Sequence, residues 1–374
     1  MLKLVKNAGL FQLHCVRIFL FCLFISFASG CETIGFYGQA ITGQLSLLAK
    51  RQDIDRVLRD ETADSALKER LILVQSIRHF ASESLALPVG KSYSSYVDLH
   101  RDVKDNFIVW NVFAAPEFSL EPHEWCYPLI GCAHYRGYFS RQAAERFAET
   151  LHTQGLESYV GAVKAYSTLG WFADPVLSTF VHFDDTRLAA LLFHELAHKV
   201  VYIRNDTEFN ESFASAVETE ALNRWLSERQ QLNLLSQRRV RKAAQAEFIE
   251  RVNALRIELG QLYSAVDVSP KDQREQKHEL FARLQQNGSQ MHSLGFRRRL
   301  QQLNNNASLV PVHSYNRWQS AFAQLLSEHG GEFPAFFSAV KRLGDLPVEQ
   351  RQLELQKLTD KQAQTVQKLT NESI

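Results

Sequence analysis

The segment LLFHELAHKVVYIRNDTEFNESFASAVETE, residues 191–220, limits the folds open to this chain more than any other. It places two histidines and two groups of acidic residues inside one of the most apolar parts of the sequence. Burying ionisable side chains without partners costs several kcal/mol. A fold that contains this segment must therefore bring these groups together or give them a ligand.

The first half of the segment predicts a helix that presents two histidines on one face. Asp184 and Asp185 can cap this helix, and no Pro or Gly interrupts the seventeen residues that follow. His194 and His198 are four residues apart, so they can converge on one ion, and Glu195 lies beside that face. Neutral imidazole suits zinc, and a neighbouring carboxylate can take a proton from a water molecule. The pattern favours a zinc site with Glu195 as the catalytic base.

The second half predicts a return helix that carries a third ligand. RNDT is a polar break with capping residues, and twelve residues separate His198 from Glu211 on the helix that follows. Three protein ligands with an open fourth position are typical of catalytic zinc. Glu218 lies two turns beyond Glu211 on the same face. It can hydrogen-bond a ligating histidine or act as the third ligand itself, and Glu211 is preferred as the ligand.

These motifs resemble a known group of enzymes. HELAH followed by NESFASAVE resembles the gluzincin metallopeptidases, and HELAH…NEGFA…E of the aminopeptidase N family in particular. With VWNVFAAPEFSLEP, WC…GC…YRGYF and AYSTLGWFADPVLST, nearly everything after Cys31 resembles a family of bacterial exported proteins described as predicted aminopeptidases. The resemblance implies Zn²⁺ held by His194, His198 and Glu211, Glu195 as general base, and a peptide or protein substrate.

The sequence departs from aminopeptidase N at two points, and the first is a shorter separation between His198 and Glu211 than in that family. Those enzymes carry a GAMEN strand whose acidic residue helps to hold the free α-amine, whereas the equivalent GAVKAYSTLGWFADP has no Glu, and Asp174 is the nearby acid. The resemblance therefore supports metallopeptidase chemistry more than aminopeptidase specificity. The piece STLGWFADP is expected to be an edge strand that pairs with substrate. Gluzincins use a tyrosine or histidine at the oxyanion, and the tyrosines considered for this role, or alternatively for core packing, are Tyr166, Tyr202 and Tyr315.

The N-terminus has the pattern of an export signal. Residues 1–17 are basic, residues 18–29 are apolar or small, and FASGC resembles a bacterial lipobox with Ala28 where Leu is usual. We expect residues 1–30 to be a signal peptide and Cys31 to carry a lipid that anchors a periplasmic lipoprotein to a membrane. An ordinary cleaved signal and an uncleaved anchor are the alternatives.

Two cysteines remain after Cys31. Cys126 and Cys132 flank a turn that contains Pro, in WCYPLIGC. In an oxidising periplasm they can form a disulfide, and two free buried thiols are the alternative.

The order of segments predicts an α+β chain that is mostly helical. Residues 36–87 have helical periodicity, FIVWNVFAA is a strand, 141–156 is an amphipathic helix, and 157–175 is a strand, a turn and a second extended piece. We expect a zincin-like catalytic core over 31–225, formed by a small sheet and the histidine helix, and a helical region over 226–374.

The helical region is expected to begin with an antiparallel hairpin at about 226–300. Its seam has heptad spacing: Phe248, Val252, Leu255, Leu259, Leu262 and Val266. This spacing suits an intramolecular hairpin and self-association equally well. The basic runs at 238–242 and 297–299 are expected to be solvated, or alternatively to contact anionic lipid headgroups.

Three functions fit these patterns. The first is a zinc peptidase at the periplasmic side of a membrane. The second is a non-catalytic binding or scaffold lipoprotein with a structural zinc site, and the third is a zinc amidase acting on cell-wall peptides. The formal net charge of +1 argues against a dedicated nucleic-acid-binding protein.

Overall fold

The computed structural model describes residues 35–99, 107–127, 131–165, 173–288, 290–291 and 293–372. The chain divides into two compact units, residues 1–50 and 51–374. In the first unit, residues 35–49 are helical, and the predicted signal peptide and Cys31 lie outside the described residues. No helix in the described ranges is both long enough and apolar enough to cross a membrane.

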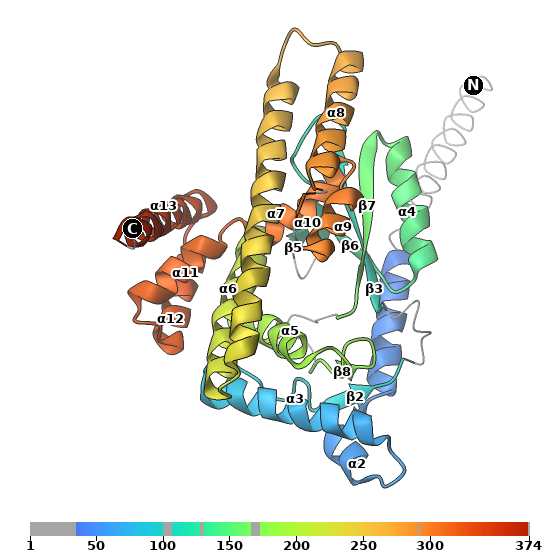
Figure 1. Cartoon of the computed structure of the whole chain (residues 1–374). Helices are drawn as coiled ribbons and strands as arrows, with labels where there is room; N and C mark the ends of the chain where they lie inside the picture. The colour runs from blue at the N-terminus through green and yellow to red at the C-terminus, as the bar shows by residue number, and fades with distance from the viewer. Residues whose placement is uncertain are drawn as a thin grey trace, which may run out of the picture. The chain divides into compact units, whose positions relative to one another are not determined.

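The second unit is mostly helical with small sheets, as the sequence predicted (Figure 1). Its strands are β1 Gln52–Asp53, β2 Ser95–Val97, β3 Val109–Pro116, β4 Trp125–Tyr127, β5 Gly131–Ala133, β6 Arg136–Tyr138, β7 Leu156–Val163 and β8 Val176–Leu177. Its helices are α2 Ile54–Arg59, α3 Ser65–Glu83, α4 Arg141–Thr153, α5 Asp185–Ala197, α6 Thr207–Glu228, α7 Leu232–Ser264, α8 Pro270–Gly288, α9 Leu294–Gln302, α10 Asn306–Asn316, α11 Gln319–Glu328, α12 Phe333–Gly344 and α13 Val348–Glu372.

The main sheet is antiparallel, with strand order β6-β3-β7. Its central strand β3 is the predicted FIVWNVFAA strand, and its β-branched and aromatic residues are buried. β7 pairs with β3 from Val109↔Val163 to Pro116↔Leu156 and has no second strand partner among the described strands. The predicted edge strand STLGWFADP lies largely outside the described residues, so β7 is the long edge strand that the structure describes.

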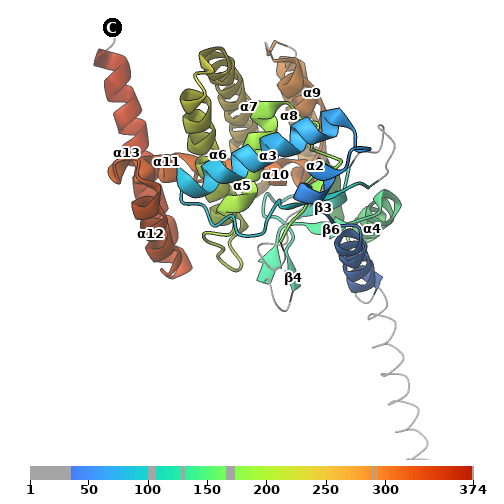
Figure 2. The same ribbon diagram turned by 90° about the horizontal axis from the view of Figure 1, so that it is seen from below.

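Helices α5 and α6 pack against each other and against α3 and α10 (Figure 2). Asp184 caps α5 by accepting from the Arg187 N–H, and Asp206 caps α6 by accepting from the Phe209 N–H. Leu192 and Phe213 are fully buried in this pair. Because α5 stops at Ala197, its second histidine stands at the helix terminus instead of mid-helix.

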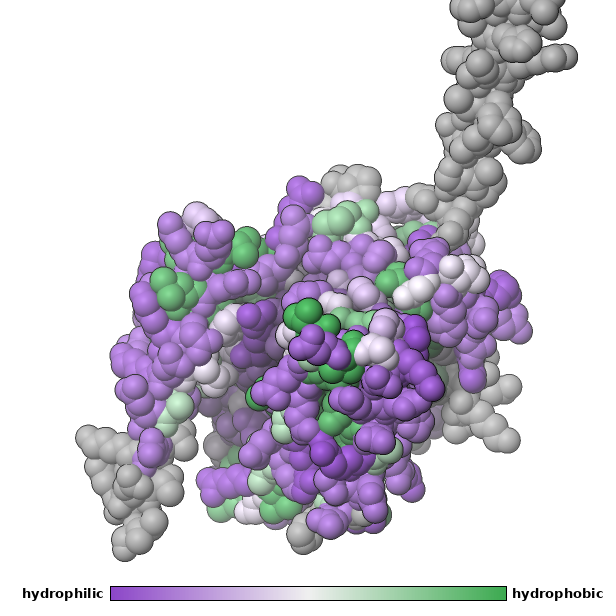
Figure 3. Space-filling model, turned by 90° about the horizontal axis from the view of Figure 1, so that it is seen from above, coloured by the Kyte–Doolittle hydropathy of each residue, from purple (hydrophilic) through white to green (hydrophobic). Residues whose placement is uncertain are grey.

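Helices α7 and α8 form a long hairpin. Five predicted seam residues are buried, but Val266 is 94% exposed, so its assignment to the seam was wrong. The reason is that α7 ends at Ser264, and Val266 lies in the connection. Figure 3 shows the molecule turned by 90° from the view of Figure 1 and seen from above. The surface on this side is mainly hydrophilic, and its apolar residues gather in small patches.

A polar network attaches the hairpin and α10 to the main sheet. Lys277 Nζ contacts Glu157 Oε1 at 2.5 Å and donates to the Glu117 carbonyl oxygen. Asn306 Nδ2 donates to three carbonyl oxygens, those of Pro116, Glu117 and Ser119. The helices after residue 225 therefore share interfaces with β3 and β7, and the predicted domain boundary at 225 stays a prediction.

Candidate metal centre

The connection between α5 and α6 is fixed by side chains on α6. Asn210 accepts from the Ile203 N–H at 2.8 Å and donates to the Ile203 carbonyl at 2.7 Å. Asp206 accepts from Arg351, whose side chain is 4% exposed and also donates to the carbonyls of Gly344 and Leu346. The turn that sets the distance between the two helices is therefore held by hydrogen bonds from two partly or fully buried side chains.

This turn brings His194, His198 and Glu211 together. The Glu211 Oε2 atom lies 3.4 Å from His194 Nε2 and 3.7 Å from His198 Nε2. One ligand atom from each of the three residues lies within 4.8 Å of the others. A sphere of two imidazole nitrogens and one carboxylate oxygen is a donor set that suits zinc.

The burial of these atoms fits a bound cation. Glu211 is 8% exposed, and its Oε2 makes no hydrogen bond with any described residue. Burial alone would raise the pKa of Glu211, but His198 and His194 lower it to about 2. A buried, ionised oxygen that faces two ring nitrogens is costly unless it meets a positive partner. The residues present therefore fit a divalent metal.

Glu195 lies on α5 beside these ligands. Burial is the main cause that raises its pKa, while the two histidines lower it. Glu211 and Asp174 add to the rise, so both carboxylates lie within electrostatic range of Glu195. A carboxylate with a raised pKa is suited to accept and return a proton near neutral pH.

Glu218 contacts His194 from the side away from Glu211. Its Oε2 lies 3.3 Å from His194 Nδ1, while Glu211 faces Nε2 of the same ring. Burial opposes the protonation of His194, but Glu211 and Glu218 raise its pKa well above its usual value. A carboxylate on Nδ1 fixes the ring orientation and leaves Nε2 for a metal. This geometry favours Glu218 as the orienting residue and Glu211 as the ligand.

Two tyrosines lie near the ligands, and sequence reasoning missed one of them. Burial raises the pKa of Tyr135 far above its usual value, and Glu211, Tyr202 and Glu195 contribute, so its phenol lies within electrostatic range of all three. Tyr202 also lies near Glu211. Tyr135 is the third residue after Cys132 and begins the YRGYF segment. This place directly after the predicted disulfide is the sequence feature that could have pointed to Tyr135 as a site residue.

Tyr166 lies outside the described residues, as does the side chain of Tyr315. Two histidines outside the site are His134, which lies 3.3 Å from Glu124, and His182, which is exposed.

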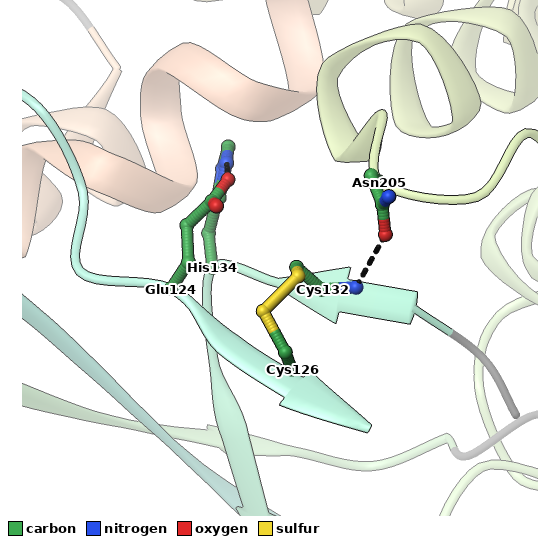
Figure 4. Close-up of a disulfide and its surroundings, with 5 residues drawn as sticks. All are labelled: Glu124, Cys126, Cys132, His134 and Asn205. Atoms are coloured by element: carbon green, nitrogen blue, oxygen red, sulfur yellow. Dashed lines mark hydrogen bonds and ion pairs between the residues drawn. A yellow bond between two sulfur atoms is a disulfide. The ribbon is translucent and has the colours of Figure 1, made fainter. Parts of the chain in front are cut away.

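Cys126 and Cys132 form a disulfide that closes the β4–β5 hairpin. Figure 4 shows Asn205, from the α5–α6 connection, reaching this hairpin, where its Oδ1 accepts from the Cys132 N–H at 2.7 Å. Gly131 has φ +85°, and a Cβ there would collide with the same Asn205 oxygen. The disulfide hairpin is therefore attached directly to the turn between the ligand helices, and Tyr135 follows it in the chain.

Comparison with known families adds an independent finding. The family model described as "Putative aminopeptidase" matches residues 35–355, which contain all the site residues above. The chain belongs to this family. Neither a curated protein nor a solved structure gave a match. Membership in the aminopeptidase family supports a peptidase-like function for the site.

Proposed function

We propose that this chain is a zinc-dependent peptidase of the gluzincin type with a zincin-like core. One observation carries the proposal: His194, His198 and Glu211 converge within 4.8 Å, and Glu195 lies beside them with a raised pKa. The membership in the aminopeptidase family supports the same conclusion.

Each residue has a distinct role in this proposal. His194, His198 and Glu211 hold zinc, which supplies a Lewis acid for the peptide carbonyl. Glu195 takes a proton from the attacking water and gives it to the leaving amine. Tyr135, which lies within electrostatic range of both Glu195 and Glu211, donates a hydrogen bond to the developing oxyanion.

Asp174 is the carboxylate best placed to hold a free α-amine. It is 3% exposed and close enough to Glu195 to raise its pKa. Arg51 and Lys199 also lie within electrostatic range of Asp174 and offset its charge. We expect Asp174→Asn to impair cleavage of peptides with free N-termini while sparing N-acetylated ones, and an equal loss on both would contradict this role.

We place the enzyme at the periplasmic side of a bacterial membrane, anchored through a lipid on Cys31. The basic and apolar pattern of residues 1–31 supports this location. The Cys126–Cys132 disulfide also supports it, because such bonds persist in oxidising compartments. The mass of the N-terminal peptide tests the lipid, and Cys31→Ser should release the chain into the soluble fraction.

The deciding experiment measures zinc content and peptide cleavage together. Wild type should hold about one zinc per chain, as one three-ligand site binds one ion. Glu211→Gln should lose zinc and activity, whereas Glu195→Gln should keep zinc and lose activity. Absence of zinc from metal-replete wild type, or full activity in Glu195→Gln, would overturn the proposal.

A further inference from the structure

One hydrogen bond joins the β4–β5 disulfide hairpin to the turn between the two ligand helices. The Cys132 N–H donates to Asn205 Oδ1 at 2.7 Å, and Figure 4 shows the Asn205 side chain pointing from that turn to the hairpin. Asn205 lies about midway along the chain between His198 and Glu211. A contact at this point therefore acts on the connection that sets how these two ligands face each other.

The backbone is unusual on both sides of this contact. Asn205 has φ +64°, a left-handed conformation that few residues other than Gly adopt, and Asn is one of those few. Gly131 has φ +85°, and its missing Cβ leaves the space that the Asn205 oxygen occupies. Conformations of this kind persist only where the surrounding structure holds them, and they gather at functional positions. Two special backbone positions thus meet where the hairpin touches the turn.

The hairpin is fixed to the main sheet at both of its ends. Ahead of β4, the His123 N–H donates to the Ala114 carbonyl on β3 at 2.8 Å. Beyond β5, the chain enters β6, which pairs with the same strand β3. Cys126 and Cys132 lie opposite each other in the hairpin, and their disulfide closes it between these two attachments. The hairpin is therefore a braced connection from β3 to the α5–α6 turn.

Side chains around the hairpin add to this support. His134 Nε2 lies 3.3 Å from Glu124 Oε1 beside the disulfide (Figure 4). The Trp125 ring lies nearly perpendicular to that of His123, with the centroids 4.8 Å apart, and its centroid is 6.0 Å from that of Phe147 on α4. Such aromatic contacts stabilise packed elements. The hairpin is thus held in place independently of the turn that it contacts.

We propose that Asn205 is a positioning residue, through which the disulfide hairpin holds the α5–α6 turn and tightens metal binding at His194, His198 and Glu211. This inference rests on the proposed zinc site. Asn210 holds the same turn from α6, whereas Asn205 holds it from the hairpin. Ligands that are already in place bind an ion more tightly than ligands that the ion must first order. A hairpin that served only the stability of the fold would not change metal affinity.

The test measures the zinc dissociation constant of the full chain by competition with a chelator, and the free energy of unfolding of the metal-free chain. Asn205→Gly keeps the left-handed backbone but removes the acceptor, so it should weaken zinc binding about 3- to 10-fold, as loss of one hydrogen bond does. Asn205→Asp keeps an acceptor oxygen and should stay within about twofold of wild type.

A control and a second variant complete the series. Gln230 is exposed and has φ +56° in the turn at the other end of α6, so Gln230→Gly is the matched control and should leave zinc affinity unchanged. The double variant Cys126→Ser, Cys132→Ser opens the hairpin and leaves Asn205 intact. It should weaken zinc binding at least as much as Asn205→Gly, and if it does not fold, Asn205→Gly alone decides.

The outcomes separate this inference from the proposed function. If the chain binds zinc and cleaves no peptide, but Asn205→Gly still weakens zinc binding, the peptidase proposal fails and the positioning role stands. If peptide is cleaved and Asn205→Gly binds zinc as wild type does, the positioning role is overturned and the peptidase stands, whether or not the unfolding free energy falls. Equally weak binding by Asn205→Asp and Asn205→Gly would also overturn the role, and a wild type that binds no zinc overturns both proposals.

Discussion

At the scale of single residues, the His194 ring carries a carboxylate on each nitrogen. Glu211 faces Nε2 and Glu218 faces Nδ1, at 3.4 and 3.3 Å. The two carboxylates lie two turns apart on one face of α6, so one helix both provides a ligand and orients another.

Replacing Glu218 tests this orienting role. Glu218→Gln should weaken zinc binding about 10- to 100-fold, because the ring loses its charged acceptor. Titration with a competing chelator measures the affinity. Glu220→Gln is the control on the same helix, since Glu220 pairs with Arg224. Equal affinities in the two variants would contradict the role.

Replacing Tyr135 tests the oxyanion donor. Tyr135→Phe should lower kcat about 10²- to 10³-fold and leave zinc content unchanged, as loss of one oxyanion donor does. Steady-state kinetics and metal analysis of the same preparation measure both quantities. Tyr202→Phe is the comparison, and a larger loss there would move the assignment to Tyr202.

The residues of the candidate metal centre that the sequence could predict are those that lie close to one another along the chain. His194, His198 and Glu211 fall on two adjacent helices, so helical geometry alone brings them near one another. Tyr135 reaches the same place from the segment that follows the disulfide hairpin. No periodicity in the sequence encodes a contact made through tertiary packing, so this residue was missed.

At the scale of elements, the predicted strand β3 formed over a nearly continuous run of buried apolar residues, and helix α4 formed where apolar residues recur at helical spacing. The predicted heptad seam ran past the true end of α7. Val266 continues the heptad spacing, but the helix stops at Ser264. The docking of α13 on the cap of α6 could not be predicted, since Arg351 and Asp206 are far apart in the chain.

The buried pair of Arg351 and Asp206 stabilises the start of α6. Arg351→Met should lower the free energy of unfolding by roughly 2 to 4 kcal/mol, because it leaves the mostly buried Asp206, whose side chain is 12% exposed, without its partner. Denaturant unfolding measures the change. Arg342→Met, at an exposed position on α12, should change stability by less than about 0.5 kcal/mol. Similar values for the two variants would show that the pair contributes little.

At the scale of the whole molecule, helices distant in sequence are joined to α6 by charged groups that respond to pH. Glu208, in the first turn of α6, contacts His313 at 3.2 Å and also pairs with Arg317. Burial alone would raise its pKa, but His313 and Arg317 lower it to about 2. This carboxylate connects α10 to the helix that carries Glu211.

The acid stability of the chain should depend on Glu208. Its folded pKa lies below the unfolded value, so its stabilisation is present above pH about 4.5 and is lost as pH falls towards about 2. The shift corresponds to about 3 kcal/mol. Unfolding free energies measured across this window should fall more steeply for wild type than for Glu208→Gln. Parallel curves would contradict the assignment.

The turn between α5 and α6 is held by Asn210, Arg351 and Asn205, none of which is a metal ligand. The site should therefore keep its shape when the ion is removed, unlike zinc modules that unfold on chelation. Treatment with a strong chelator should abolish activity and leave the circular dichroism spectrum unchanged, and added zinc should restore activity without refolding. The ion would then be an exchangeable part, so cobalt could be substituted for it as a spectroscopic reporter of the ligand sphere.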